Sequence, residues 1–280
     1  KYLTNLAAVD AAKVQDAAKL FLNTNQMHIV IVGNAKQITK GLEKYGPVKY
    51  FDIEGNEIAA PTEVKADASL TPAALMEKAI AAIGTKEALD NVKDVQLKGT
   101  ANLMGQSLEM KQTIVMPGNS VTTMSMGGMA MMRQAVVDGK YSFAQQGQEA
   151  PITDDIKEGL DESAFLAPEQ LYLAKGYGLK IVGAEKVDGK DAIDVEVTTP
   201  SKKVSHRFYD ATTFLLVKTS KSEEVPGQGT MTQQQYYTGY KVVNGVQIAS
   251  EQLIDMGQMK INIKYTDIKM NQGLKSSDLK

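Results

Sequence analysis

The spacing of apolar and polar residues changes part-way along the chain, from a helical period to strict alternation. Over residues 9–22 apolar side chains recur at helical spacing, with Asp10 placed as an N-cap. Residues 27–33, MHIVIVG, form an apolar run ended by glycine, which predicts a buried strand. A second amphipathic helix is predicted over 36–46, and a short strand and turn over 48–56.

A polar segment then separates two parts of different character. Residues 60–70, APTEVKADASL, predict a linker, so residues 1–59 form a small α/β segment by themselves. A helix is expected next, with Thr71 as its cap, Pro72 at its first position and Gly84 as its stop.

Beyond residue 93 the period becomes 2. The alternation is clear over 95–103, 107–116, 192–199 and 259–266. Strands with one apolar and one polar face are typical of an antiparallel sheet that is covered on one side only. Hairpin turns are predicted at five dipeptides, which are Met104-Gly105, Gly127-Gly128, Asp138-Gly139, Asp188-Gly189 and Asn244-Gly245.

The meander is interrupted by residues 151–176, which predict two short helices, the second opened by Pro168. A curved sheet with one apolar face must close on itself or be covered. We therefore expect an α+β fold: the small α/β segment, followed over residues 71–280 by a large curved antiparallel sheet (a half-barrel) with a helical lid.

Composition narrows the classes of function. The chain has 280 residues, a formal net charge of −2 and only two arginines, which argues against a nucleic-acid partner. No run of 18 apolar residues predicts a transmembrane span. Cysteine is absent, so disulfides and thiolate chemistry are excluded, and no cofactor or metal site is predicted. The chain starts without an initiator methionine or a signal-peptide core, and we expect a piece of a longer or processed protein.

One stretch concentrates methionine. Residues 121–134, VTTMSMGGMAMMRQ, hold five of the chain's 14 methionines. If the two glycines form a two-residue turn, Met126 lies opposite Met129 and Met124 lies opposite Met131. Directly opposed side chains project to the same face, and Arg133 follows one step further on it. The predicted apolar patch therefore contains Met124, Met126, Met129, Met131 and Arg133.

The patch has three interpretations. In the first, the patch is the wall of a cavity for an acyl chain, with Arg133 near the mouth of the cavity. In the second, it is a packing contact between the sheet and the lid helices. In the third, it is an exposed hairpin tip that docks on a partner. The turn at Pro117-Gly118 decides its face. A three-residue loop places Met124 and Met126 on the side of Leu97, Leu108 and Met110, and a two-residue loop places them outside.

Other chemically distinctive residues favour structural roles, and no catalytic residue is predicted. His28 begins an apolar strand, and His206 alternates with Val204 and Phe208 without a catalytic-triad pattern. The acidic residues Asp154, Asp155, Glu158, Asp161 and Glu162 lack calcium-loop spacing and predict the solvated face of a lid helix. Tyr236, Tyr237 and Tyr240 are interpreted as core and edge packing.

The first part of the chain resembles a known enzyme family. Residues 1–58 are similar to the C-terminal end of an insulinase/pitrilysin-type zinc peptidase domain, through the segment VDAAKVQDAAKLFLNTNQMHIVIVGNAKQITKGLEKYGPVKYFD. The resemblance implies a peptidase domain upstream in the same parent protein. The family's His-x-x-Glu-His zinc motif is absent here, so this chain by itself is not expected to be an enzyme.

The larger part resembles a carrier fold. Residues 71–280, with their leading helix, meander and midway helices and the segments 186–223 and 236–254, resemble the LolA-like lipoprotein-carrier fold. That fold is a half-open antiparallel barrel with a helical lid over an apolar cavity. The resemblance implies an acyl chain or a lipoprotein as partner, and a periplasmic or outer-membrane-associated location.

Three functions follow as expectations. The first is a non-catalytic region whose half-barrel binds an apolar ligand, either an acyl chain or part of a lipoprotein. The second is an accessory substrate-capture region of a zinc metallopeptidase whose catalytic site lies upstream. The third is a purely structural region in which the sheet binds nothing.

Overall fold

The chain divides into two compact units, residues 1–61 and residues 62–280. The computed structural model describes residues 8–22, 28–33, 35–51, 55–58, 69–103, 105–225, 229–257 and 259–279. Met27, Met104 and linker residues 60–68 lie outside the described residues. The assignment of 60–70 as a linker therefore stays a prediction.

The helices of the first unit follow the sequence pattern. The Asp10 side chain accepts a hydrogen bond from the backbone N–H of Lys13 at 2.9 Å, which caps the first helix as predicted. The elements are α2 (Ala11–Phe21), α3 (Ala35–Leu42), η2 (Glu43–Tyr45), and the antiparallel pair β1 (Tyr50–Phe51) and β2 (Glu57–Ile58).

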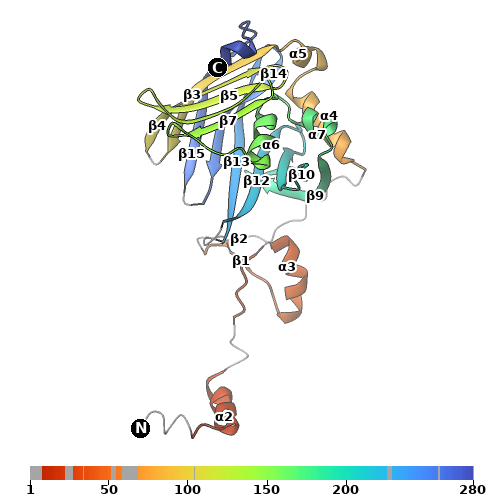
Figure 1. The fold of residues 1–280 in the computed structure, drawn as a ribbon. Helices are drawn as coiled ribbons and strands as arrows, with labels where there is room; N and C mark the ends of the chain where they lie inside the picture. The colour runs from red at the N-terminus through yellow and green to blue at the C-terminus, as the bar shows by residue number, and fades with distance from the viewer. Residues whose placement is uncertain are drawn as a thin grey trace. The chain divides into compact units, whose positions relative to one another are not determined.

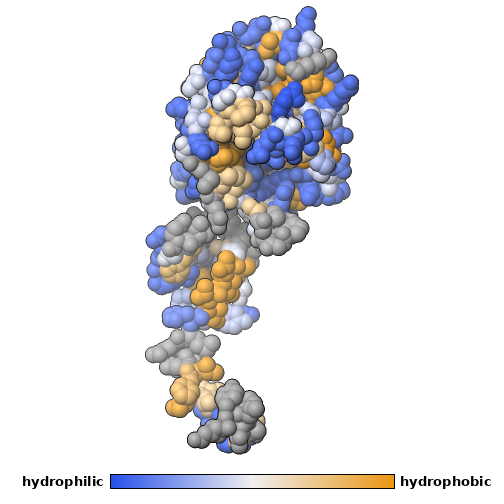
Figure 2. All heavy atoms as spheres, turned by 60° about the vertical axis from the view of Figure 1, so that its left-hand side comes forward, coloured by the Kyte–Doolittle hydropathy of each residue, from blue (hydrophilic) through white to orange (hydrophobic). Residues whose placement is uncertain are grey.

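The strand predicted over residues 27–33 is wrong for the described residues 28–33, which are not part of any strand. The side chains of Val30 and Val32 are 85% and 97% exposed. Apolar atoms are visible on the outside of this unit in Figure 2. A strand that is apolar on both faces needs cover on both sides, and the described residues of the first unit supply none.

In the second unit the described residues form one antiparallel sheet and several helices (Figure 1). The helices are α4 (Pro72–Ile83), α5 (Lys86–Asp90), α6 (Asp154–Ser163), α7 (Glu169–Ala174) and η3 (Ser276–Leu279). The strands are β3 (Asp94–Leu103), β4 (Gln106–Val115), β5 (Asn119–Met126), β6 (Met129–Val137), β7 (Lys140–Gln145), β8 (Gln148–Glu149), β9 (Gly178–Val187), β10 (Lys190–Thr198), β11 (Val204–Asp210), β12 (Leu216–Val225), β13 (Gly229–Val243), β14 (Val246–Asp255) and β15 (Lys260–Met270).

In this sheet each strand pairs with the next strand along the chain, except between β8 and β9. Its strand order is β8-β7-β6-β5-β4-β3-β15-β14-β13-β12-β11-β10-β9, so the first and last strands of the unit pair at its centre. The two outermost strands, β8 and β9, do not pair with each other, and the chain between them forms α6 and α7. The sheet is curved but unclosed (Figure 1).

The hairpin turns fall where the dipeptides predict them. Met126 pairs with Met129, Val137 with Lys140, and Val187 with Lys190. The turn residues Asp138, Asp188 and Asn244 all have positive φ, and each is followed by a glycine with positive φ. Two successive positive-φ residues match the twist of the flanking strands, which explains why these dipeptides predict hairpins reliably.

The core lies on one face of the sheet, here called the inner face and identified by Val95, Leu97, Leu108, Met110 and Ile114. Two groups of helices cover it. Leu75, Met76 and Ala79 of α4, with Tyr172 of α7, pack on Ile193, Val195, Val197 and Tyr209. Leu160 and Ala164 of α6 pack on Val136 of β6. The predicted α+β fold with a curved antiparallel sheet and a helical lid is therefore confirmed. Among the described residues no helix has the length and apolar character needed to cross a bilayer.

Candidate functional site

A groove of about 670 Å³ opens on the inner face, at the end of the sheet where the β3–β4, β5–β6 and β7–β8 turns lie. That volume falls within the range of roughly 300–1,000 Å³ typical of ligand pockets. The groove is lined by Leu103, Gln106, Leu108, Met124, Met126, Met131, Met132, Gln145, Gln146, Gln148, Glu149, Ala150 and Pro151.

The β4–β5 turn puts the methionines inside. Val115 pairs with Asn119, so three residues form the loop, which is the inward alternative of the two considered above. Met110 then pairs with Met124, and both project to the inner face. Met124 and Met126 pack against the core cluster that contains Leu108 and Met110.

The β5–β6 pairing differs from the simple hairpin register. Met126 does oppose Met129, but Met124 opposes Met132 and not Met131, because a β-bulge shifts the register next to Met124. The backbone N–H of Gln146 in the β7–β8 turn donates to the carbonyl of Met131 at 2.9 Å, which holds the bulged residue. The bulge thus brings both Met131 and Met132 to the groove.

Two members of the predicted patch lie elsewhere. Met129 is 69% exposed and does not line the groove. Arg133 pairs with Thr123, which places it on the opposite face from Met124. There its guanidinium donates to the Leu279 carbonyl at 3.0 Å and to the Ser142 hydroxyl at 3.2 Å. The expectation that Arg133 lies near the cavity mouth is therefore wrong, because the bulge inverts the alternation beyond Met131.

The remaining predicted apolar residues divide between groove and core. Leu108 lines the groove, whereas Leu97 and Met110 are buried in the core cluster behind it. Sequence reasoning missed Met132 and the glutamine side of the groove. The dipeptide Gln146-Gly147 has the φ values of 50° and 78° that favour a tight hairpin, and it was the available signal for this turn.

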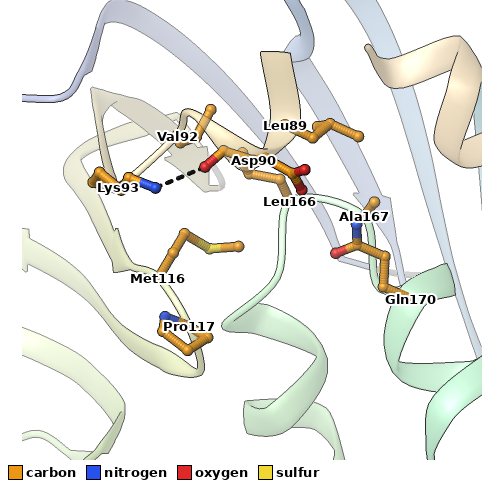
Figure 3. Close-up of a pocket in the computed structure, with 9 residues that line it drawn as sticks. All are labelled: Leu89, Asp90, Val92, Lys93, Met116, Pro117, Leu166, Ala167 and Gln170. Atoms are coloured by element: carbon orange, nitrogen blue, oxygen red, sulfur yellow. Dashed lines mark hydrogen bonds between the residues drawn. The ribbon is translucent and has the colours of Figure 1, made fainter. Parts of the chain in front are cut away.

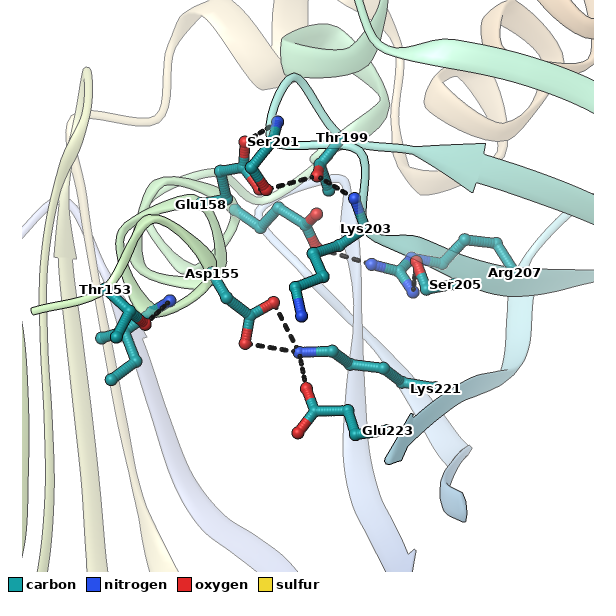
Figure 4. Close-up of polar contacts among 12 residues, drawn as sticks. Thr153, Asp155, Glu158, Thr199, Ser201, Lys203, Ser205, Arg207, Lys221 and Glu223 are labelled. Carbon is teal, nitrogen blue, oxygen red and sulfur yellow. Dashed lines mark hydrogen bonds and ion pairs between the residues drawn. The ribbon is translucent and has the colours of Figure 1, made fainter. Parts of the chain in front are cut away.

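Helix α6 is fixed across the inner face by charged contacts (Figure 4). Lys221 of β12 contacts both carboxylate oxygens of Asp155 at 2.7 Å. The guanidinium of Arg207 on β11 contacts Glu162 at 2.6 Å. On its other side, α6 accepts a hydrogen bond from Tyr141 of β7 to Asp161. Of the acidic residues expected to form a solvated face, Asp155, Asp161 and Glu162 therefore attach the lid to strands from both halves of the sheet. Asp154 is exposed, as predicted.

Glu158 completes the attachment through the turn that follows β10. Its carboxylate accepts hydrogen bonds from the Ser201 backbone N–H at 2.8 Å and from the Ser201 hydroxyl at 2.6 Å. Burial by itself raises the pKa of Glu158, but hydrogen bonds from Ser201 and Thr199 outweigh it and hold the pKa below its ordinary value of 4.5.

The Ser201→Ala substitution is expected to lower the free energy of unfolding by about 1 kcal/mol at pH 7. Because the folded-state pKa of Glu158 is lowered, this contribution is complete above about pH 4.5 and is lost as the pH falls through the folded-state value. Urea unfolding at pH 7 and at pH 3.5 measures both differences. The matched control is Ser222→Ala, whose hydroxyl bonds Thr232 and no carboxylate, and whose effect should not change with pH. An equal effect of Ser201→Ala at both pH values would contradict the prediction.

Helix α7 is held by a buried polar pair. Glu169 is 1% exposed, and one of its carboxylate oxygens accepts a hydrogen bond from the Tyr209 hydroxyl at 2.9 Å. The other oxygen has no hydrogen-bond partner among the described residues. Burial raises the pKa of Glu169, so the neutral carboxyl is favoured beside the apolar contact of α4 with the sheet.

The histidines and tyrosines considered in the sequence do not line the groove. His28 is exposed in the first unit. His206 lies on the outer face, where its Nδ1 is 2.8 Å from Asp194, and this hydrogen bond raises the pKa of His206 above 6.5. Tyr240 donates to the Leu216 carbonyl at 2.6 Å. Within the described part of the chain, no three His, Asp or Glu side chains are placed to hold a metal ion.

A smaller cavity of about 240 Å³ lies beside α5, where the β4–β5 turn meets the α6–α7 connection (Figure 3). Its lining mixes apolar and polar side chains, and the Lys93 ammonium is bonded to the Asp90 carbonyl at 2.7 Å. The lining residues are Leu89, Asp90, Val92, Lys93, Met116, Pro117, Leu166, Ala167 and Gln170. It is below the usual volume of a ligand pocket, so the methionine groove is the stronger candidate.

Solved structures share this architecture. A DUF1329 family protein from Desulfovibrio piger matches with a TM-score of 0.53 and 12% identity, over 75% of this chain and 98% of that one. A putative outer membrane lipoprotein-sorting protein domain from Vibrio parahaemolyticus matches with a TM-score of 0.51 and 12% identity, over 73% and 95%. The second unit shares the fold of these two proteins. A LolA superfamily protein from Nitrosomonas europaea also matches, with a TM-score of 0.48 and 12% identity, over 76% of this chain and 98% of that one.

The matched region lies mostly in the second unit, because the first holds only 61 of the 280 residues, whereas the matches cover 75% and 73% of the chain. The predicted resemblance to the carrier fold is thereby confirmed for the fold alone. No family model matches the chain. No curated protein matches it either. The resemblance of residues 1–58 to a zinc peptidase therefore finds no support in these comparisons.

Proposed function

We propose that residues 62–280 form a binding module that holds an apolar ligand, an acyl chain or the lipid part of a lipoprotein, in the methionine groove. The observation that carries this proposal is the groove of about 670 Å³ with a floor of methionine and leucine side chains. Methionine is unbranched and polarisable, so such a floor repacks around apolar groups of different shape.

The mechanism is reversible burial of hydrocarbon, without covalent chemistry. Each buried methylene contributes about 0.8 kcal/mol, so six of them supply about 5 kcal/mol before the cost of association. The shared fold with a lipoprotein-sorting domain supports this class of ligand. It also supports a location in the periplasm or at the outer membrane. The alternative, an accessory region of a zinc peptidase, rests only on the resemblance of residues 1–58.

The proposal is tested first on the isolated chain. Native mass spectrometry is expected to show a bound lipid, and 1-monolauroylglycerol is expected to displace the uncharged dye N-phenyl-1-naphthylamine. Failure of the dye and of the lipid to bind would exclude an apolar-ligand function for the groove.

The double substitution Met124→Ser with Met131→Ser is expected to weaken binding of 1-monolauroylglycerol about ten-fold or more, because it replaces apolar floor with hydroxyls. Dye displacement measures the affinity, and circular dichroism follows the fold. The matched control is Met129→Ser, which changes an exposed methionine of the same hairpin and should leave binding unchanged. If the double variant loses binding only because it unfolds, the two methionines are packing residues and not a binding floor.

A further inference from the structure

The polar side of the methionine groove is made almost wholly of neutral amides. Four of its lining residues are glutamines, Gln106, Gln145, Gln146 and Gln148, and its single charged residue is Glu149. Among the described residues that line the groove there is no lysine, arginine or histidine. The groove therefore offers hydrogen bonds but no positive charge.

The glutamines lie beside the methionine floor of the groove. Gln145 opposes both Met132 on β6 and Gln148 on β8, so amide side chains follow directly on the methionine floor. The backbone N–H of Gln146 donates to the carbonyl of the bulged Met131. The turn that carries the amides is therefore hydrogen-bonded to the strand that carries the methionines. Within the described part of the chain, the side-chain amides of these glutamines form no hydrogen bond, and all are exposed.

Nearby cations are placed on the other side of the sheet. Lys98 and Lys111 pair with each other on the outer face, as their alternation with Leu97 and Met110 requires. Arg133 is likewise on the outer face and is bonded to Leu279. Glu149 pairs with Ala144, which pairs with Arg133, so the Glu149 side chain projects to the outer face as well. An anionic group at the rim would therefore meet neutral amides and no compensating charge.

We propose that the groove binds acyl chains carried by an uncharged head group with hydroxyl, ester or amide functions, and discriminates against anionic ones such as free fatty acids. This inference rests on the proposed function of the groove. A glutamine amide both donates and accepts, so it satisfies hydroxyl, ester and amide groups alike. An ionised carboxylate keeps its hydration better in water than beside neutral amides.

The test compares two probes with the same twelve-carbon chain, 1-monolauroylglycerol and laurate, at pH 7.5 and low ionic strength. Displacement of N-phenyl-1-naphthylamine from the full chain gives both affinities. The uncharged probe is expected to bind about five-fold more tightly, because amides at a solvated rim replace only part of the hydration of an ionised carboxylate. Gln148→Lys, which puts a cation beside Gln145 on the inner face, is expected to improve laurate binding about ten-fold relative to 1-monolauroylglycerol.

The matched control is Glu109→Lys, an exposed charge reversal on the outer face of β4, which should leave the ratio of the two affinities unchanged. Two outcomes would overturn the inference while leaving the proposed function in place: laurate binding as tightly as 1-monolauroylglycerol, or a ratio of affinities that does not change in Gln148→Lys. If the dye and both probes fail to bind, the proposed function itself falls. A preference that appears in the wild type and inverts in Gln148→Lys supports both.

Discussion

Replacing Arg207 with alanine is expected to lower the free energy of unfolding of the second unit by about 3 kcal/mol. The guanidinium contacts Glu162 at 2.6 Å and the Tyr172 hydroxyl at 3.1 Å, so it joins β11 to both lid helices. The Arg207 and Glu162 side chains are only 12% and 20% exposed. Removing the cation leaves a largely desolvated carboxylate without its partner, and this accounts for most of the loss.

Urea unfolding followed by circular dichroism measures the effect. Lys86→Ala serves as the matched control, because Lys86 and Asp90 form an ion pair of the same length whose side chains are 87% and 60% exposed. That pair should contribute less than about 0.5 kcal/mol. Combining Arg207→Met with Glu162→Gln should recover part of the lost stability, since no unpaired charge remains. A loss below about 1 kcal/mol in Arg207→Ala would show that this contact does not hold the lid.

Replacing Gly99 with alanine is expected to destabilise the second unit by about 3 kcal/mol or more. A Cβ at this position would lie 2.0 Å from the carbonyl oxygen of Lys264 and 2.7 Å from the Cα of Tyr265. Both atoms are backbone, so no side-chain rotation relieves the collision. The close approach occurs beside the β-bulge of β15, where the first and last strands of the unit pair.

The matched control is Gly159→Ala in α6, where an added Cβ meets no atom within 4 Å. This substitution is expected to be neutral or to stabilise by up to about 1 kcal/mol, because alanine favours the helix. Thermal unfolding of both variants separates the two cases. Equal stability of Gly99→Ala and the wild type would mean that β3 and β15 do not approach as closely as described.

Much of the second unit could be predicted because its signals are local. The alternation of apolar and polar residues determines which side chains of one strand share a face. Turn dipeptides such as Gly127-Gly128 require positive φ at two successive residues, and this requirement is independent of distant parts of the chain. Local signals also determine the ends of α4, which begins after the Thr71 cap with Pro72 at its first position and ends at Gly84. These signals were sufficient for the α+β class and for the order of elements.

The first unit shows the limit of such signals. The apolar run that ends at Gly33 has the composition of a buried strand, yet residues 28–33 pair with no strand in the described chain. A strand forms only when a neighbour satisfies its backbone groups and covers its side chains. Composition alone cannot supply that neighbour.

Local pattern therefore determined the strands, the turns, the lid helices and the presence of a methionine hairpin. The composition of the groove required the tertiary structure. Only the bulge at Met131, held by a hydrogen bond from a turn fifteen residues further along the chain, brings Met132 to the floor and sends Arg133 to the outer face. One extra residue in a strand inverts every later side chain, and a backbone hydrogen bond from the β7–β8 turn stabilises it at Met131. The pairing of the acidic helix with Lys221 and Arg207 has the same origin, because their partners meet only after the sheet has curved.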